Sequence, residues 1–299
     1  MKKEKYLKYS VFIIISFYTT ICYGQDSEKP AVIKNFRSNE LINTQTTESI
    51  QSNAVEFNIK HRFGVVSPGR EILTEFLGMD LPSNIRLGLA IPISDRLYIG
   101  VGRTRFNKIY DFEGKYIVTQ QTEDESSPVS IAAYFNAAIR TDNFPSVPDN
   151  AYFEDGHTPF EYHFVHRLAY NSQLIISRKF GNKLSLQVAP TLVYRNLVSP
   201  ERDNYVMAVP IGGSIKTGLT SSIIFEYSYI INENLSNHRY PLSIGYEIAT
   251  AGHTFQIFLT SSQHILQQQL LTTEQADYLN GNFVLGFNLK RVFWKRNKK

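Results

Sequence analysis

Residues 55–63 read VEFNIKHRF, and apolar and polar side chains alternate along this stretch with a period of two. The odd-numbered positions include the apolar residues Val55, Phe57, Ile59 and Phe63. The even-numbered positions are Glu56, Asn58, Lys60 and Arg62. Successive side chains of a β-strand point to opposite faces of the sheet. The stretch therefore predicts a strand with one apolar face and one charged face.

The same alternation returns along the rest of the chain. Twelve segments carry it: 55–63, 84–91, 97–102, 110–119, 129–140, 167–177, 184–195, 205–211, 222–229, 242–248, 254–259 and 282–289. The links after odd-numbered segments are long and those after even-numbered segments are short, with exceptions at 107–108 and 122–127. Long and short links then fall at opposite ends, which predicts an up-and-down antiparallel meander of about twelve strands.

The first 24 residues have the composition of an export signal. Four lysines precede an apolar run at 11–18, and small or compact residues follow at Cys22 and Gly24. This order is typical of a secretory signal peptide, here 1–24, cleaved before Gln25. The full chain of 299 residues has a net charge of +4, but this segment holds four lysines and one glutamate. Its removal leaves 27 basic and 26 acidic residues, a net charge of +1, so the charge indicates no nucleic-acid partner.

The remaining chain divides into three parts. Residues 25–54 are rich in Ser, Thr, Asn, Gln and Glu without an apolar period, which predicts a flexible periplasmic leader. Residues 55–294 hold the alternating segments and predict the barrel. Residues 295–299 read KRNKK and predict a short basic tail.

Alternation alone does not decide which face meets water. Apolar side chains point inward in a soluble barrel, whereas in a transmembrane barrel they meet lipid and the polar ones line the lumen. Three features favour a transmembrane barrel: the export signal, strand lengths near the roughly 9 to 11 residues of a tilted span, and small residues beside charges on the polar face. We therefore predict an all-β, antiparallel transmembrane barrel. The lumen-lining candidates are Glu56, Lys60, Arg62, Arg86, Arg140, Arg167, Arg195, Glu226 and Glu247.

Several short runs of residues carry a resemblance to a known family. They are HRFG at 61–64, NIRLGL at 84–89, DRL at 95–97, GVGR at 100–103, SRKF at 177–180, YRNLV at 194–198, GHTFQ at 252–256, GFNL at 286–289 and RVF at 291–293. In these runs the chain resembles an uncharacterised family of Gram-negative β-barrel proteins, catalogued as a domain of unknown function. The resemblance implies a barrel in the lipid bilayer of the outer membrane, inserted by the barrel assembly machinery, and it implies no activity.

Residue patterns for catalysis or metal binding are weak. His163 and His166 are predicted at the start of a strand, where a spacing of three puts them on opposite faces, and no Gly-x-Ser-x-Gly elbow is present. We expect no catalytic residue, no metal site and no cofactor, and hence no enzyme. The link 262–280 has apolar residues at helical spacing, which predicts a short helix packed on the barrel rim.

The charged inward face leaves two functions open. Mixed charges in a lumen can select which solutes pass, which predicts a narrow channel for small polar solutes. The same charges can also pair with one another and rigidify a closed barrel. In that case the protein is a non-conducting structural barrel, or one that binds a partner through its long extracellular loops.

Overall fold

A computed structural model describes residues 31–148, 150–153, 155–199, 201–232 and 239–294, of which residues from 32 onward belong to one unit. The predicted signal peptide at 1–24 and the basic tail at 295–299 lie outside the described residues. The strands are β1 Ala54–Val66, β2 Asn84–Pro92, β3 Leu97–Thr104, β4 Ile109–Thr119, β5 Ser130–Arg140, β6 Leu168–Phe180, β7 Leu184–Val188, β8 Thr191–Arg195, β9 Tyr205–Lys216, β10 Ser221–Ile230, β11 Leu242–Ala249, β12 His253–Thr260 and β13 Phe283–Trp294. The helical turns are α2 Arg70–Thr74, η2 Phe76–Gly78, η3 Phe106–Lys108, η4 Phe164–Arg167, α3 Gln267–Leu270 and η5 Tyr278–Asn280.

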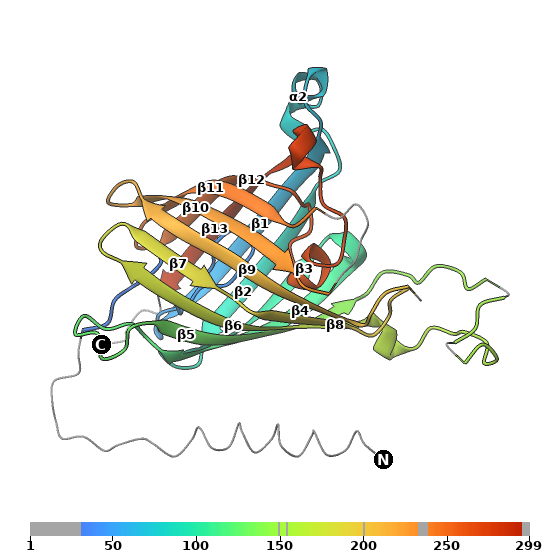
Figure 1. The fold of residues 1–299 in the computed structure, drawn as a ribbon, viewed down its shortest axis with the longest axis horizontal. Coiled ribbons are helices and arrows are strands. Elements are labelled where there is room, and N and C mark those ends of the chain that lie inside the picture. The colour runs from blue at the N-terminus through green and yellow to red at the C-terminus, as the bar shows by residue number, and fades with distance from the viewer. Residues whose placement is uncertain (1–30, 149, 154, 200, 233–238, 295–299) are drawn as a thin grey trace, which may run out of the picture. The chain divides into compact units, whose positions relative to one another are not determined.

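The strands close into one antiparallel barrel (Figure 1). Each span pairs with the next along the chain, and β1 pairs with β13 to complete the circle. β7 and β8 are two halves of one span, because both lie between β6 and β9. The break falls at Ala189 and Pro190, whose backbones still bond to Pro210 and Leu174. The barrel therefore has twelve spans, and the predicted fold class is confirmed.

The links sort by length between the two ends of the barrel. Links 67–83, 141–167, 196–204, 231–241 and 261–282 lie at one end, which we call the long-link end, together with the short link that holds η3. The other links lie at the opposite end, the short-link end, where β1 begins and β13 finishes. This is the arrangement that an up-and-down meander with an even number of spans requires.

The polar side chains, which occupy every second position of a strand, point into the barrel. In β1 the side chains of Glu56, Asn58, Lys60 and Arg62 are buried, and the other strands repeat this pattern. Leu89, Phe112 and Ile244 lie on the opposite parity and are exposed on the outer wall. Among the described residues no helix is long and apolar enough to cross a membrane. The polar side chains of the strands thus face the interior of the barrel, and the apolar side chains face outward.

The structure contradicts the prediction of a flexible leader for most of its length. Residues 32–53, which we call the N-terminal insert, run into the barrel from the short-link end, and almost all of positions 35–47 are buried. Val32 forms a β-bridge to Thr122 at the entrance. The insert lacks an apolar period because it packs against polar side chains of the wall, and only the tertiary structure supplies those partners.

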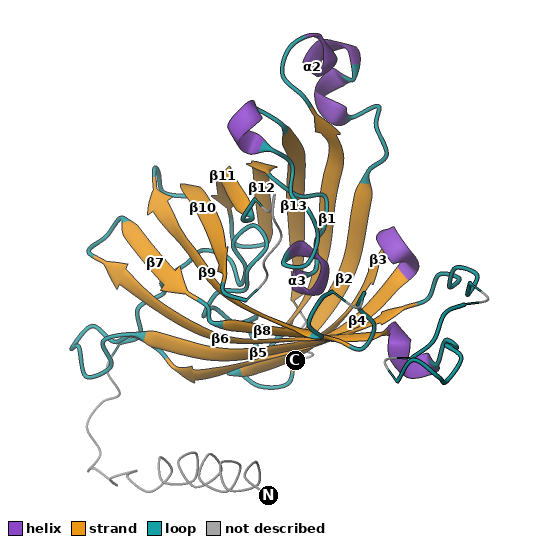
Figure 2. Cartoon of the chain, turned by 45° about the vertical axis from the view of Figure 1, so that its right-hand side comes forward, coloured by secondary structure: helices purple, strands orange, loops and turns teal. Residues whose placement is uncertain are grey.

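The prediction of a helix on the rim is also corrected. Residues 261–276, which we call the loop insert, turn into the barrel at the long-link end, and α3 is a single turn within it (Figure 2). Leu271 packs against Val193, Val206 and Ile230, and Leu266 packs against inward residues of β4 and β5. The leucines at helical spacing therefore pack against the inner wall of the barrel.

The outer wall offers a test of the sidedness of the barrel. Leu89→Arg places a charge on the apolar outer face of the barrel. It should destabilise the folded protein in lipid vesicles, lowering the free energy of unfolding by about 2–4 kcal/mol. The control, Leu73→Arg, lies in α2 outside the strands, and it should change stability by less than about 0.5 kcal/mol. Denaturant titration read by heat-modifiable gel mobility measures both. Equal effects of the two variants would contradict the assigned faces.

Candidate functional site

The centre of the lumen is occupied by a tight hairpin of the N-terminal insert. Glu40 and Gln45 form an antiparallel bridge, and the Leu41 N–H donates to the Thr44 carbonyl at 2.9 Å. The Thr46 N–H donates to the Asn39 carbonyl at 3.0 Å. Residues 39–46, which we call the stopper hairpin, therefore satisfy part of their own backbone. The rest of their polar groups must find partners on the wall.

The tip of the stopper hairpin binds a single wall carboxylate. Glu226 on β10 accepts the backbone N–H groups of Ile42, Asn43 and Thr44 at 3.1, 2.8 and 2.8 Å. Three successive N–H groups that converge on one anion form a nest, and hydrogen bonds to a charged acceptor are the stronger class. This carboxylate thus fixes the depth to which the hairpin reaches.

Three buried lysines hold the sides of the stopper hairpin. Glu40 is ion-paired with Lys60 on β1 and with Lys290 on β13, the second pair at 3.3 Å. Lys115 on β4 donates to the carbonyl oxygens of Asn39 and Thr46 at 2.8 and 2.9 Å. The hairpin therefore supplies the acceptors that these buried ammonium groups need, since an unpaired buried charge is strongly destabilising.

Arg62, on β1 like Lys60, also joins the hairpin to the wall. Its guanidinium donates to the Asn43 side chain at 3.0 Å and to Asn288 on β13 at 2.9 Å. The same group lies 4.3 Å from the ring centre of Phe258, which is close enough for a cation–π contact.

One charge network belongs to the wall alone. Arg86 on β2 makes a two-point contact with Asp111 on β4, at 3.0 and 2.6 Å, and also donates to Asn58 at 3.2 Å. A Cβ at Gly102 would lie 2.4 Å from the Arg86 guanidinium, so only glycine leaves room for it there. The small residues on the polar face are therefore spacers for large charged neighbours.

The two inserts meet and close the lumen. Gln267 of the loop insert donates to the Asn43 carbonyl of the stopper hairpin at 3.0 Å. The space left between them, beside Arg86 and Asn136, is a cavity of about 10 Å³. That volume holds about one water molecule. At this level of the barrel, the described parts of the two inserts therefore leave space for little more than a single water molecule between them.

The barrel fold agrees with a comparison to known families. Residues 36–293 match the family described as Membrane bound beta barrel domain (DUF5777). The chain belongs to this family. The resemblance predicted from the short sequence runs is thereby confirmed, and the protein is a membrane-bound β-barrel. The match begins inside the N-terminal insert, so the stopper hairpin is part of the DUF5777 domain.

Two solved porins are similar to the chain at low sequence identity. The chain is similar to the structure titled "KdgM porin", with a TM-score of 0.45 and 8% identity over 80% of this chain and 99% of that one. It is also similar to a NanC porin, with a TM-score of 0.47 and 7% identity over 81% and 100% of the two chains. No curated protein matches the chain. These similarities are too distant to transfer a function.

The sequence-predicted lumen residues separate into two groups. Six of them are buried in the interior: Glu56, Lys60, Arg62, Arg86, Glu226 and Glu247. The other three, Arg140, Arg167 and Arg195, are partly exposed and lie together at the long-link end. Sequence reasoning missed Lys290, although it continues the polar parity of 282–288, and it missed Glu40 because no alternation marks the insert.

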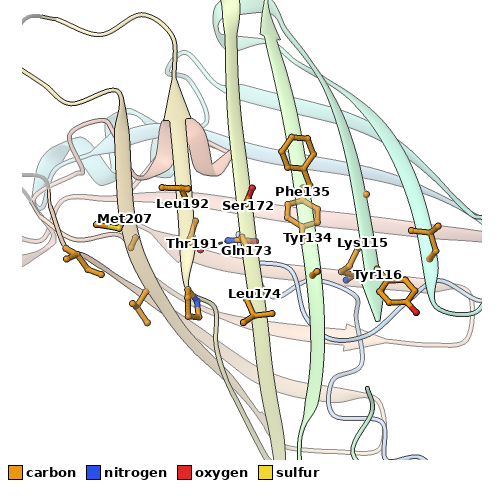
Figure 3. A pocket seen from close by; sticks show the side chains of 17 residues that line it. Lys115, Tyr116, Tyr134, Phe135, Ser172, Gln173, Leu174, Thr191, Leu192 and Met207 are labelled. Carbon is orange, nitrogen blue, oxygen red and sulfur yellow. Dashed lines mark hydrogen bonds between the residues drawn. The ribbon is translucent and has the colours of Figure 1, made fainter. Parts of the chain in front are cut away.

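A large hollow lies on the outer wall of the DUF5777 barrel. It measures about 820 Å³, and the small residues Gly114, Ala133 and Ser172 line it. Figure 3 shows larger side chains such as Leu174 and Leu192 beside it, while Gln173 and Thr191 are bonded to each other at 3.0 Å. Its lining is mostly apolar, as contact with lipid chains requires, so it offers little to bind a polar solute.

The histidine pair has a different structure from the one predicted. His163 caps η4 and His166 lies within it, so neither is on a strand, and their ring centres are 5.5 Å apart. The His163 N–H donates to the His166 ring at 3.1 Å. Within the described part of the chain, no three His, Cys, Asp or Glu residues are grouped to hold a metal ion.

The nest at Glu226 can be tested by amide exchange. Glu226→Gln removes the charge that receives three N–H groups, a loss of about 1.5–3 kcal/mol for such bonds. Exchange at Ile42, Asn43 and Thr44 should then accelerate by about 10- to 150-fold. The control is Glu113→Gln, a wall carboxylate bonded to Arg86 and Tyr134, which should leave these three amides unchanged. Unchanged exchange in Glu226→Gln would show that the nest does not hold the tip.

Proposed function

We propose that the protein is an outer-membrane barrel through which small polar solutes pass when the stopper hairpin leaves the lumen. The single observation that carries this is the hairpin itself, which is held by hydrogen bonds and ion pairs to the wall. Such bonds exchange for water at modest net free energy, about 0.5–1.5 kcal/mol each for neutral pairs. The resting protein is closed, and no catalytic residue is required.

Apolar contact adds only a small anchor to the hairpin. Leu41 and Ile42 of the hairpin, together with Phe36 before it, pack against Ile224 and Phe258, and the other wall contacts of the hairpin described above are polar. Once the hairpin leaves, the polar parity of the strands faces water, as the lumen of a conducting barrel does. The closed and open states therefore differ mainly in whether the hairpin or water forms hydrogen bonds with the polar groups of the wall.

Conductance in planar bilayers tests this function. The intact chain should show no steady ion current, and a variant with residues 35–48 replaced by a Gly-Ser segment of equal length should conduct. Deletion of 141–158, which lies outside the strands, is the matched control and should leave the barrel closed. Heat-modifiable mobility confirms that each variant folds.

A disulfide lock separates withdrawal of the hairpin from damage to the barrel. The hydroxyls of Thr47 and Ser177 lie 2.6 Å apart, so Thr47→Cys with Ser177→Cys can bridge the insert to β6. The locked protein should lose any voltage-induced opening of the intact chain and regain it with reductant. A folded Gly-Ser variant that never conducts would remove the channel function.

Partner binding is the second candidate, and the long-link end supports it. Leu73 in α2 is 83% exposed and Phe76 in η2 is 61% exposed, on a link that extends beyond the strands (Figure 2). Exposed apolar side chains of this kind mark contact surfaces. Leu73→Ser with Phe76→Ser should abolish adhesion of expressing cells or capture of a surface partner, and leave conductance unchanged. Unchanged adhesion would remove this candidate.

A further inference from the structure

The outer wall carries a group of tyrosines near the long-link end. Four of them are exposed and lie within two residues of the long-link end of their strands: Tyr110, Tyr194, Tyr205 and Tyr229. Tyrosine is enriched where the wall of a barrel meets lipid headgroups, because its ring is apolar and its hydroxyl is polar. These side chains therefore mark the level of the headgroups at this end of the barrel.

One arginine of the outer wall lies at the same level. Arg103 is the second-last residue of β3, and it pairs in register with Tyr110 on β4. It occupies an outward position of β3, as the exposed residues Ile99 and Val101 do. A barrel tolerates an arginine on its lipid-facing side near the headgroups, whereas the same residue near the midplane of the bilayer is costly. Arg103 therefore lies on the lipid-facing side at the depth of the headgroups.

Two further basic residues follow Arg103 in the turn to β4. Arg105 and Lys108 are both exposed, and Lys108 belongs to η3. Asn107 and Lys108 have left-handed backbone angles, with φ of 56° and 47°, which residues other than glycine adopt rarely. Backbone strain of this kind is found mainly at functional positions. The turn thus places three positive charges close together in the sequence, at the end of the barrel where the tyrosines lie.

The contacts that the two arginines make within the protein are with neutral groups. The Arg103 guanidinium donates to the Thr104 carbonyl and lies 4.8 Å from the ring centre of Tyr110. The Arg105 guanidinium donates to the Ser83 carbonyl. Carbonyls and a ring orient a guanidinium without neutralising it. Among the described residues, no carboxylate lies within ion-pair distance of these two arginines or of Lys108.

An outward arginine near the other end of the barrel is compensated by the chain itself. Arg178 lies near the short-link end of β6, and its guanidinium is 3.3 Å from the carboxylate of Glu125. The chain therefore supplies an anion to Arg178, whereas the cluster at 103–108 needs one from outside the described residues.

We propose that Arg103, Arg105 and Lys108 bind a phosphate group on the headgroup of a membrane lipid. A guanidinium donates two parallel hydrogen bonds to a phosphate, and an ammonium group adds a further charge. The occupant is a lipid because the wall beside Arg103 is apolar: Leu87, its partner on β2, and Val101 are exposed and would contact the acyl chains. The long links of outer-membrane barrels face the cell exterior, so the lipid belongs to the outer leaflet. Binding on the outer wall does not need the stopper hairpin to move, so the site stands independently of the proposed passage.

Native mass spectrometry of the full chain in detergent tests the site with a phosphorylated lipid. The probe is lipid A with its two phosphate groups, and lipid A from which both phosphates have been removed is the matched counterpart. The phosphorylated form should bind about tenfold more tightly or better, as expected for added charged contacts. Equal binding of the two forms would overturn the role of the phosphate. Inorganic phosphate at millimolar concentration should not displace the lipid, and complete displacement would overturn the assignment to a lipid.

Variants of the basic residues complete the test. Arg103→Gln with Arg105→Gln should weaken binding of phosphorylated lipid A by about tenfold or more and leave binding of the dephosphorylated form unchanged. Lys108→Glu, which lies outside the strands, reverses one charge and should also weaken binding of the phosphorylated form. The matched control is Arg178→Gln, which removes an outward arginine near the short-link end and should have no effect. Heat-modifiable mobility confirms that each variant folds. If the folded variants at 103, 105 and 108 bind phosphorylated lipid A as the intact chain does, the cluster is not the site.

Discussion

The contact on which the interior depends is the one between Glu226 and the tip of the stopper hairpin. A barrel of eight spans fills its interior with its own side chains, whereas sixteen or more leave an aqueous channel. Twelve spans lie between these limits. Their inward side chains do not reach across the lumen, and water or another segment of chain must satisfy them. Here the chain's own insert does so, and the nest at Glu226 sets its position.

This arrangement makes the wall and the insert mutually dependent. Lys60 and Lys290 share Glu40, and Lys115 donates to the carbonyls of Asn39 and Thr46, the first of which also accepts an N–H of the hairpin itself. Without the insert these groups would face water, which solvates them well. With it they are buried but paired. The open state that we propose would leave the same wall groups hydrogen-bonded to water.

The charges are also distributed along the barrel axis. Opposite charges are paired in the central lumen, as Arg86 and Asp111 show, and at the long-link end Arg140, Arg167 and Arg195 line one small cavity, with Asp142 paired to Arg140.

The sequence determined the barrel because alternation is local. Parity along each strand specifies which residues share a face, and the lengths of the links specify which ends of the strands adjoin. The same parity placed Glu56, Arg62 and Glu226 on the inward face. Only the tertiary structure decided that the polar stretch before β1 and the leucines of the loop insert lie inside. The stretch before β1 carries no apolar period, and the helical spacing of the leucines does not show what they pack against, because the partners of both segments come from strands far away in the chain.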